Sequence, residues 1–380
     1  MNFLFIGNPA STLIQQLCYE LKKNKNISID IISTSFFDSQ INYSNYFNNI
    51  YHLEDKYKLL RKIPYLKIIY FIYNLRSLLK KLPTYNAVSI HYVYYFYAFL
   101  IEDFKSKGNK IILSFWGSDF NSTNYWQKYF IRIAVNNADI ITTANEEMKD
   151  RLINKYKIPN EKCIIARFGL NILEIIKINF ELLNKSNAKK YFKISDNFII
   201  TIGYNSNRNQ QHIRIINEIN SIKDKLPQNY ILLFPLTYNF KNSSDYIALI
   251  QNKLIKYKLN YKFIDYYLTD IEVANLRVAT DILIQLQKHD LFSGSMQEHF
   301  SAGSLVITGR WLPYQKFKDV GIYFREIEDF SKLNKLLLEA ISNYNEENKL
   351  LKNNFIKVWN LSSWEKVISK WEHILGIIKN

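Results

Sequence analysis

The sequence contains little cysteine, glycine or proline and has no apolar run of membrane-spanning length. Its 380 residues include only two cysteines, Cys18 and Cys163, which are far apart and lack metal-ligand spacing. This excludes a disulfide framework and favours a reducing compartment. The apolar run at residues 87–101 is rich in tyrosine and shorter than a membrane span. The sequence therefore predicts a protein that is soluble or lies on a surface.

The N-terminus lacks the basic residues that open a signal peptide. Asn8 and Pro9 also interrupt its short apolar run. We therefore expect a cytoplasmic protein, either free or peripheral at the inner face of the cell membrane.

Acidic residues are in the minority. The 34 acidic residues face 50 basic ones, which gives a formal charge of +16. Such an excess attracts polyanions, whether nucleic acid, anionic lipid or sugar phosphates, and does not distinguish among them. The apolar fraction of 48% is ample for a globular protein, so extended disorder is not expected.

Short β-rich runs alternate with longer amphipathic ones, which is typical of parallel α/β layers. The first set of predicted strands covers residues 2–6, 28–32, 88–92, 110–115 and 139–143. The pattern restarts near residue 197, with strands at 198–203, 230–236, 261–265, 281–286, 305–308 and 321–324. The predicted helices include 146–156, which Asn145 can cap, and 210–226, 244–257, 270–279 and 295–302.

A chain of this length exceeds one ordinary core and suits two domains. The repeated pattern predicts two Rossmann-like, doubly wound domains. We expect an N-terminal domain at 1–170, a polar linker at 171–196, a C-terminal domain at 197–345 and C-terminal helices at 346–380. One helical stripe in the last segment contains Trp364, Ile368, Trp371 and Leu375, which indicates packing against a domain.

The segment after the strand at 281–286 carries the most informative polar residues. Ligands of open α/β sheets bind beyond the carboxyl ends of the strands, where backbone amides can hold anions. Ser293, Gly294 and Ser295 are small residues whose amides can face a phosphate. Glu298 lies one turn further on the same face and can accept hydrogen bonds from the hydroxyls of a ribose. Asp290, on the preceding loop, can hold hydroxyls of a transferred sugar.

This segment resembles the acidic-x7-acidic motif of GT-B glycosyltransferases, especially family 4. The chain has Asp290-x7-Glu298 followed by Ser301-Ala302-Gly303, whereas the family usually has Glu-x7-Glu and an Ala-x-Gly turn. The aspartate shortens the reach of the first position. The resemblance implies two domains facing a cleft, an acceptor-side domain first, a nucleotide-sugar domain second, and a C-terminal helix that returns toward the N-domain.

A further segment resembles a part of the same family. The sequence Phe115-Trp116-Gly117-Ser118-Asp119 is similar to its His-Gly-x-Asp-like loop, which implies that Asp119 binds the acceptor or stabilises charge. Asp119 as a helix cap is an equal alternative. His91 is a third catalytic candidate, although a lone histidine in an aromatic run is more often a satisfied buried residue.

The loop at 203–212 corresponds to the family's diphosphate clamp, which normally has an arginine and a lysine. This chain offers Arg208 without a lysine, and Asn205, Asn207 and His212 are the remaining donor-binding candidates. The loop also resembles an enterobacterial transferase that adds a dideoxy-acetamido sugar to a lipid-linked acceptor. Because that family is usually inverting, the stereochemical outcome stays open.

The resemblance implies transfer of a sugar from a nucleotide diphosphate to a surface polysaccharide, a lipopolysaccharide or a polyprenyl-linked glycan. No Asp-x-Asp and no metal-ligand spacing occur, so we expect neither a metal ion nor a cofactor. Basic and aromatic residues alternate over 56–83, with a helix expected at 65–81. This composition suits an anionic membrane surface, or equally a packed helix with a solvated basic edge.

Two alternatives have less support. A Rossmann oxidoreductase requires Gly-x-Gly-x-x-Gly after the first strand, where this chain has Gly7 alone. A non-enzymatic polyanion-binding protein explains the charge but not the pair formed by Asp290 and Glu298. No nucleic-acid-binding motif occurs, so nucleic acid is not an expected partner.

Overall fold

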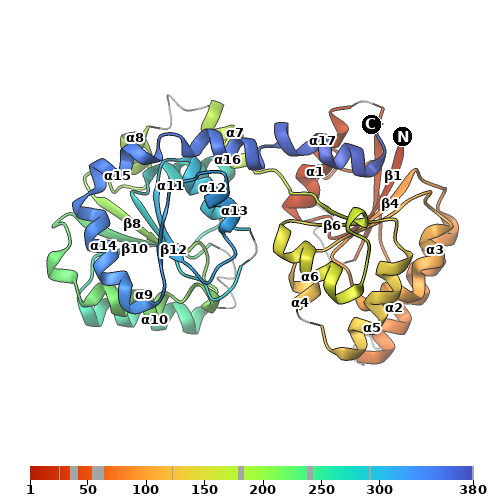
Figure 1. Cartoon of the computed structure of the whole chain (residues 1–380), viewed down its shortest axis with the longest axis horizontal. Coiled ribbons are helices and arrows are strands. Elements are labelled where there is room, and N and C mark those ends of the chain that lie inside the picture. Colours follow the sequence, from red (N-terminus) through yellow and green to blue (C-terminus); the bar gives the residue numbers. More distant parts are fainter. Residues whose placement is uncertain are drawn as a thin grey trace. The chain divides into compact units, whose positions relative to one another are not determined.

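The chain forms two compact units, each built around a parallel sheet. The computed structural model describes residues 1–24, 26–34, 42–53, 64–121, 123–178, 184–237, 243–290 and 292–378. The first unit comprises Met1–Gly169 and Trp364–Asn380, and the second comprises Leu170–Ser363 (Figure 1). In the described ranges, no helix has both the length and the apolar character needed to cross a bilayer.

The first unit contains a seven-stranded parallel sheet in the order β3-β2-β1-β4-β5-β6-β7. Its strands are β1 (Asn2–Gly7), β2 (Ser28–Ser33), β3 (Asn49–Tyr51), β4 (Ala87–His91), β5 (Ile111–Ser114), β6 (Ile140–Thr143) and β7 (Cys163–Ile165). The central strands are buried on both faces, as parallel sheets covered by helices require. The five predicted strands are confirmed, whereas β3 and β7 are only three residues long and gave no pattern in the sequence.

Helices cover both faces of this sheet. They are α1 (Thr12–Lys22), α2 (Pro64–Lys81), the 3₁₀ helix η2 (Tyr95–Leu100), α3 (Ile101–Lys105), α4 (Ser118–Asn121), α5 (Tyr125–Asn137), α6 (Glu146–Tyr156) and α17 (Trp364–Leu375). The side chain of Asn145 accepts a hydrogen bond from the backbone N–H of Met148 at 2.8 Å, which confirms the predicted cap of α6. The basic segment at 56–63 lies outside the described residues.

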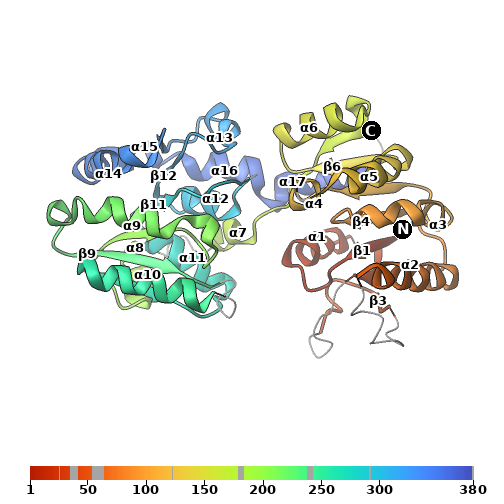
Figure 2. The ribbon, with the colours of Figure 1, turned by 90° about the horizontal axis from the view of Figure 1, so that it is seen from below.

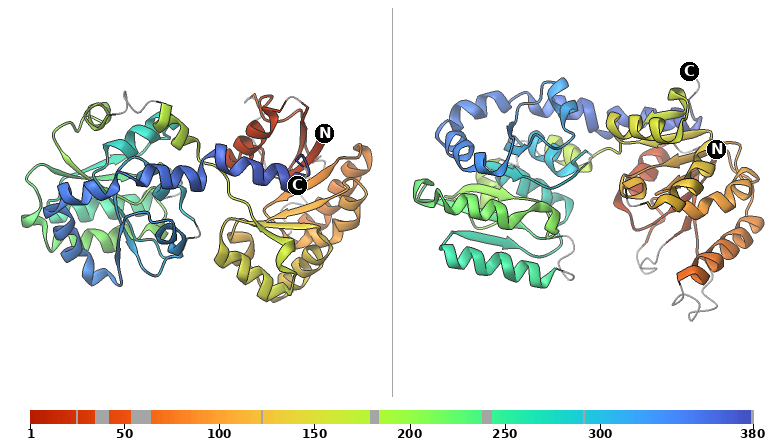
Figure 3. Two further views of the ribbon diagram at one scale, coloured as in Figure 1. Left: turned by 45° about the horizontal axis from the view of Figure 1, so that its top comes forward. Right: turned by 60° about the horizontal axis from the view of Figure 1, so that its bottom comes forward.

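The end of the chain belongs to the first unit. Trp364, Trp371 and Leu375 of α17 are buried with residues of α1 and β1 in one core, which confirms their predicted packing. The indole N–H of Trp371 donates to the carbonyl of Arg167 at 2.8 Å. Figure 3 shows the dark-blue end of the chain within the first unit in both views.

Only the last part of the predicted C-terminal segment is in that unit. The assignment of all of 346–380 to the N-domain is wrong, because residues 346–363 belong to the second unit. Val358, Trp359 and Leu361 of α16 (Asn354–Ser362) are buried in the second unit's core, against Met296 and Phe300. Because the apolar face of α16 packs in the second unit, the chain returns to the first unit only after this helix.

The second unit contains a six-stranded parallel sheet in the order β10-β9-β8-β11-β12-β13. Its strands are β8 (Phe198–Ile202), β9 (Tyr230–Pro235), β10 (Tyr261–Ile264), β11 (Ile282–Gln285), β12 (Leu305–Gly309) and β13 (Arg325–Ile327). The predicted strand at 321–324 is wrong. Gly321 adopts φ +74°, and the backbone of Tyr323 bonds to the side chain of Asn354 instead of β12.

The second unit has helices before its first strand as well as between its strands. They are α7 (Asn171–Ile178), α8 (Lys185–Tyr191), α9 (His212–Asn220), α10 (Ser244–Tyr257), α11 (Asp270–Ala279), α12 (Gly294–Ser301), α13 (Gln315–Asp319), α14 (Leu333–Ser342), α15 (Tyr344–Leu351) and α16. The predicted helix at 210–226 is shorter, because Gln211 adopts a left-handed φ of +59° and α9 ends at Asn220.

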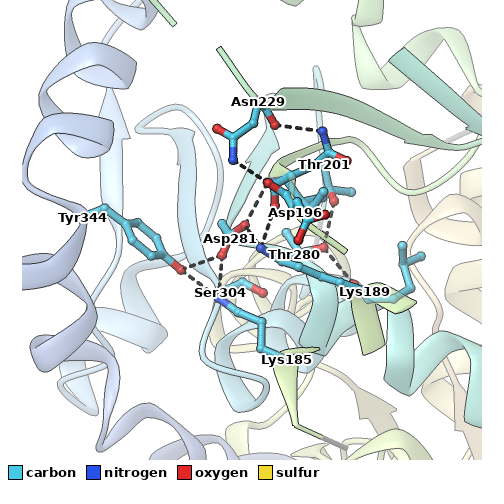
Figure 4. A network of polar contacts seen from close by, with 12 residues as sticks. Lys185, Lys189, Asp196, Thr201, Asn229, Thr280, Asp281, Ser304 and Tyr344 are labelled. Carbon is cyan, nitrogen blue, oxygen red and sulfur yellow. Dashed lines mark hydrogen bonds and ion pairs between the residues drawn. The ribbon is translucent and has the colours of Figure 1, made fainter. Parts of the chain in front are cut away.

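The predicted linker at 171–196 is also wrong. It contains α7 and α8, whose residues Ile172, Leu173 and Ala188 are buried, and both helices pack against α11. The lysines that made the segment look solvated have a structural role. Figure 4 shows Lys185 and Lys189 converging on Asp281, at 2.8 and 2.7 Å.

Asp281 connects α8 and α15 to the start of β11. Its carboxylate also accepts hydrogen bonds from the backbone N–H of Ile199 at 2.8 Å and from Tyr344 at 3.2 Å. Burial acts to raise the pKa of Asp281, but Lys185, the hydrogen bond from Ile199 and the one from Lys189 hold it below its ordinary value. This network lies at the amino end of the sheet and fixes the scaffold of the second unit.

Candidate functional site

Two loops meet at the carboxyl edge of the second sheet. One loop follows β8 and the other follows β11. These two strands are neighbours in the sheet, although the chain continues from β8 to β9, which lies on the other side of β8. Such a reversal of strand order is where open α/β sheets bind ligands. The side chain of Asn209 donates to the carbonyl of His289 at 3.1 Å, and Gln210 donates to Gln287 at 3.0 Å. The two segments that carry the donor-binding residues predicted from sequence therefore meet at one edge of the sheet.

Asp290 is held in place by a buried tyrosine. The hydroxyl of Tyr314 donates to Oδ2 of Asp290 at 2.5 Å, and the side-chain amide of Gln287 donates to the same hydroxyl at 3.2 Å. Burial, and secondly the charge of Asp290, raise the pKa of Tyr314 well above its usual range, so the phenol remains a donor. The sequence analysis missed Tyr314 and Gln287. The sequence did contain one indication of a polar site here, because Gln285 and Gln287 are polar residues at the end of an otherwise apolar predicted strand.

The start of α12 places small polar residues at the same edge. Ser293 caps the helix, since its hydroxyl accepts hydrogen bonds from the backbone N–H of Met296 at 3.2 Å and from Gln285 at 2.8 Å. The hydroxyl of Ser295 is buried and has no partner among the described residues. A Cβ on Gly294 would lie 3.2 Å from Leu170, so this position is closely packed. The three residues therefore form a fixed helix start.

Glu298 is paired with an arginine that the sequence analysis missed. Nε of Arg277, on α11, lies 3.0 Å from Oε2 of Glu298. Both side chains are largely buried, with 8% and 12% of their surfaces exposed. Burial raises the pKa of Glu298, and Arg277 counteracts that rise. Figure 2 shows α12 beside α11 and α7. The only sequence signal was a single charged residue in the apolar stretch 274–279.

Arg208 is the exposed cation of the loop after β8. Its guanidinium lies 4.5 Å from the ring centroid of Tyr246, whose hydroxyl is 3.3 Å from Nδ1 of His212. Asn205 organises the turn before it, because its side chain accepts a hydrogen bond from the backbone of Asn207 at 2.9 Å. The arginine is thus positioned by an aromatic platform at the carboxyl edge.

His212 lies beneath this loop and is fully buried. Burial lowers the pKa of its imidazole to about 3, which keeps the ring neutral. Its Nε2 has no partner among the described residues. A Cβ on Gly203 would lie 3.0 Å from that nitrogen and 3.0 Å from Oε1 of Gln210, and Gly203 has φ +63°. A glycine is therefore required where β8 ends.

Asp119 organises a loop of the first unit. Its buried carboxylate accepts backbone hydrogen bonds from Val93 at 2.9 Å, Trp116 at 3.0 Å and Gly117 at 2.8 Å. Burial raises its pKa to about 6, although these hydrogen bonds oppose the rise. The carboxylate thus faces backbone donors, which favours the structural alternative over direct contact with an acceptor.

His91 lies in the core of the first unit. It is 1% exposed, its ring stacks on Phe5 at 5.0 Å, and Trp371 lies 6.0 Å away on its other flank. Burial lowers the pKa of His91 to about 3. Its Nε2 is 3.1 Å from the hydroxyl of Ser89. A general base needs access to its substrate, so this position argues against the catalytic role considered for His91.

The described residues contain no group of three or more histidine, cysteine, aspartate or glutamate side chains that could hold a metal ion. The chemistry available at the second unit's edge comes instead from two carboxylates, two guanidinium groups and several neutral amides. Such a set can bind an anion and several hydroxyl groups at once.

Comparisons with known proteins agree with this geometry. Residues 10–172 match the model of the family described as Glycosyltransferase Family 4. A glycosyltransferase from Rickettsia africae is 16% identical, with a TM-score of 0.76 over 100% of this chain and 99% of that chain. HepE from Anabaena, solved in complex with UDP, is 12% identical, with a TM-score of 0.70 over 100% of both chains. No curated protein matches the chain in sequence.

The same fold occurs in an enzyme of another class. The UDP-GlcNAc 2-epimerase of Neisseria meningitidis, solved with UDP-GlcNAc, is 14% identical, with a TM-score of 0.64 over 100% of both chains. These structural likenesses establish the fold, while the family match concerns the first unit. Together they show that the chain has the GT-B fold and that its residues 10–172 are similar to the glycosyltransferases of family 4.

Proposed function

We propose that this chain transfers a sugar from a nucleotide-diphosphate donor to a hydroxyl of a surface-glycan or lipid-linked acceptor. The main support is the placement of Asp290 and Glu298 at one edge of the sheet. Asp290 is held by Tyr314, and Glu298 is held by Arg277. The alternative of a non-enzymatic polyanion-binding protein leaves these two positioned carboxylates without a purpose.

Each group has a role in donor binding. Glu298 uses Oε2 for Arg277, and no hydrogen bond reaches its Oε1 within the described ranges, so Oε1 can accept from ribose hydroxyls. Arg208, with the amides at the start of α12, would neutralise the diphosphate. Asp290, which accepts a hydrogen bond from the hydroxyl of Tyr314 at 2.5 Å, would hold a hydroxyl of the sugar.

The reaction itself needs charge stabilisation. The acceptor oxygen forms a bond to the anomeric carbon, the bond from that carbon to the diphosphate breaks, and the diphosphate leaves with the bonding electrons. The hydroxyl proton goes to a base or to the leaving phosphate. Cations such as Arg208 stabilise the charge that develops on the diphosphate. The proposed reaction therefore needs no metal ion.

Donor binding is the first test. Calorimetric titration of the full chain with UDP-, GDP- and dTDP-sugars should find one nucleotide that binds, and the structures of HepE with UDP and with UDP-glucose make UDP the first choice. Glu298→Gln keeps the size of the side chain and should weaken that binding by about 1.5–3 kcal/mol, the value of a charged hydrogen bond. Glu339→Gln on α14, a half-exposed position, is the matched control and should bind like the wild type. Equal affinity in all three proteins would contradict the donor site.

Transfer is the second test. The donor that binds is incubated in excess EDTA with lipid-linked and free glycan acceptors, and the product is followed by mass spectrometry. We expect transfer of one sugar without added metal. Activity that appears only with Mn²⁺ would contradict metal independence alone. Conversion of the donor to its epimer without transfer would overturn the proposed function.

A further inference from the structure

Three neighbouring elements of the first unit expose many large apolar side chains. We name the following residues the aromatic face: Leu66, Ile69 and Tyr73 of α2, Tyr94 and Phe99 in and beside η2, and Tyr125, Trp126 and Tyr129 of α5. Trp126 is 72% exposed and Tyr125 is 81% exposed. Because η2 packs against both α5 and α2, these three elements are neighbours within the first unit.

A layer of less exposed rings supports this face. Phe96 of η2 lies 5.1 Å from Phe71 of α2, and Phe99 lies 4.8 Å from Phe130 of α5. Asn124 and Gln127 form a reciprocal capping box that fixes the start of α5, where the most exposed rings stand. The exposed side chains are therefore held on ordered helices rather than on a loop.

The charge of these elements has one sign. α2, η2 and α5 contain no acidic residue, and their basic residues are Lys67, Arg76, Lys80, Lys81, Lys128 and Arg132. Of these, Arg76 pairs with Asp103 at 2.9 Å. Beside α5, burial and then repulsion from Lys128 and Arg151 lower the pKa of Lys155 to about 8. The positive potential of this surface is therefore only partly neutralised within the protein.

Exposed aromatic rings on elements with an excess of basic residues match the chemistry of an anionic bilayer surface. Tryptophan and tyrosine favour the headgroup region, and lysine and arginine are attracted by anionic lipids. Several large exposed apolar side chains on neighbouring elements are typical of a site that binds a membrane or another protein. We propose that the aromatic face binds the surface of an anionic lipid bilayer, with α5 as the principal anchor. From the sequence, only the segment that contains α2 was considered for binding to a membrane surface.

The face continues toward the carboxyl edge of the first sheet. The ring of Tyr94 stacks on Phe96 at 5.1 Å and lies 4.9 Å from Tyr92, which directly follows β4. The hydroxyl of Tyr92 accepts a hydrogen bond from Ser118 at 3.2 Å, in the loop that Asp119 organises. This part of the inference rests on the proposed function, because bilayer binding would bring a lipid-linked acceptor to that edge.

The test is co-sedimentation of the full chain with vesicles at low salt. Wild-type protein should bind vesicles that contain phosphatidylglycerol more tightly than pure phosphatidylcholine vesicles, and added salt should weaken the binding. The double variant Trp126→Ala/Tyr129→Ala should bind at least about tenfold more weakly. Tyr266→Ala/Tyr267→Ala removes two exposed tyrosines of the second unit and should bind like the wild type. Lys128→Glu/Arg132→Glu should lose the preference for anionic vesicles.

Melting curves confirm that each variant is folded before it is compared. Wild-type protein that stays in the supernatant, or a Trp126→Ala/Tyr129→Ala variant that sediments like the wild type, would overturn the proposal. So would binding to an anionic oligonucleotide without binding to vesicles. Titration with a UDP-sugar is measured on the same proteins. Vesicle binding without any donor binding would refute the proposed function, but it would still support the proposal that the aromatic face binds a bilayer.

Discussion

At the scale of single residues, close packing decides which side chains are possible at the carboxyl edge of the second sheet. Gly203 ends β8 with φ +63°, and its missing Cβ leaves room for His212 and Gln210. Gly303 also has a positive φ, +76°, but nothing lies within 4 Å of the position that a Cβ would take. Substitutions at these two glycines therefore distinguish the cost of backbone strain alone from the cost of strain together with a steric conflict.

We expect Gly303→Ala to cost about 1 kcal/mol of unfolding free energy, from strain alone. Gly203→Ala should cost more, by about another 1–3 kcal/mol, and should weaken donor binding, because the new methyl group displaces the two side chains that line the edge. Chemical denaturation and calorimetric titration measure the two effects. Equal stability and equal affinity in the two variants would refute the packing argument.

Asp281 provides the clearest dependence of stability on pH. Its folded-state pKa is lowered, so its ion pairs contribute stability above the unfolded pKa of about 3.9 and lose it as the pH falls through the folded value. Asp281→Asn should cost about 3 kcal/mol at neutral pH, because Lys189 keeps its charge in a largely buried place. Denaturation from pH 7 to pH 3 should show the gap from the wild type closing below about pH 4. A gap that stays constant with pH would contradict the role of this carboxylate.

At the scale of elements, one arginine of α2 differs from its neighbouring lysines. Arg76 lies 2.9 Å from Asp103 of α3 and donates to the carbonyl of Phe99 at 2.6 Å. It therefore joins α2 to α3 and η2. Lys80 and Lys81 are exposed at the end of the helix. Charge reversal should separate a structural role from a surface role.

Arg76→Glu should lower the unfolding free energy by about 1–2 kcal/mol, since it loses the hydrogen bond to Phe99 and places a carboxylate beside Asp103. Lys80→Glu/Lys81→Glu should leave the melting temperature nearly unchanged and weaken binding to anionic vesicles. Calorimetric melting of the variants checks the first statement. Should both proteins melt alike, Arg76 has no role in joining the helices.

At the scale of the whole molecule, the chain leaves the first unit after Gly169 and re-enters it at Trp364. The first core is thus completed by the last segment, where Trp371 is buried and bonded to Arg167. The second unit holds its own sheet and all the candidate donor residues. Damage to α17 should consequently act on one unit.

Trp371→Ala should destabilise the first unit by roughly 3–5 kcal/mol, the usual cost of removing a buried tryptophan. Binding of a UDP-sugar by the second unit should persist. Hydrogen exchange followed by mass spectrometry can assign the loss to residues 1–169, with the peptides of 198–309 as the internal control. Equal loss of protection in both units would contradict this division.

The sequence by itself determined the features that depend on near neighbours. Runs such as 2–6 and 198–203 have the composition of buried strands, and the cap of Asn145 needs only the three residues after it. The spacing of Asp290 and Glu298 is likewise local. It predicted that both residues follow the strand now seen as β11, and the structure places them there.

Only the tertiary structure decided the contacts between distant residues. Glu298 and Arg277 are 21 positions apart and Lys189 and Asp281 are 92 apart, so no local pattern pairs them. The segment 171–196 was predicted as a linker because its lysines pair with Asp281, which is distant in the sequence. Without that partner, such lysines are expected to be solvated. His91 gave no sign of its burial, because its ring is enclosed by aromatic residues from both ends of the chain, Phe5 and Trp371.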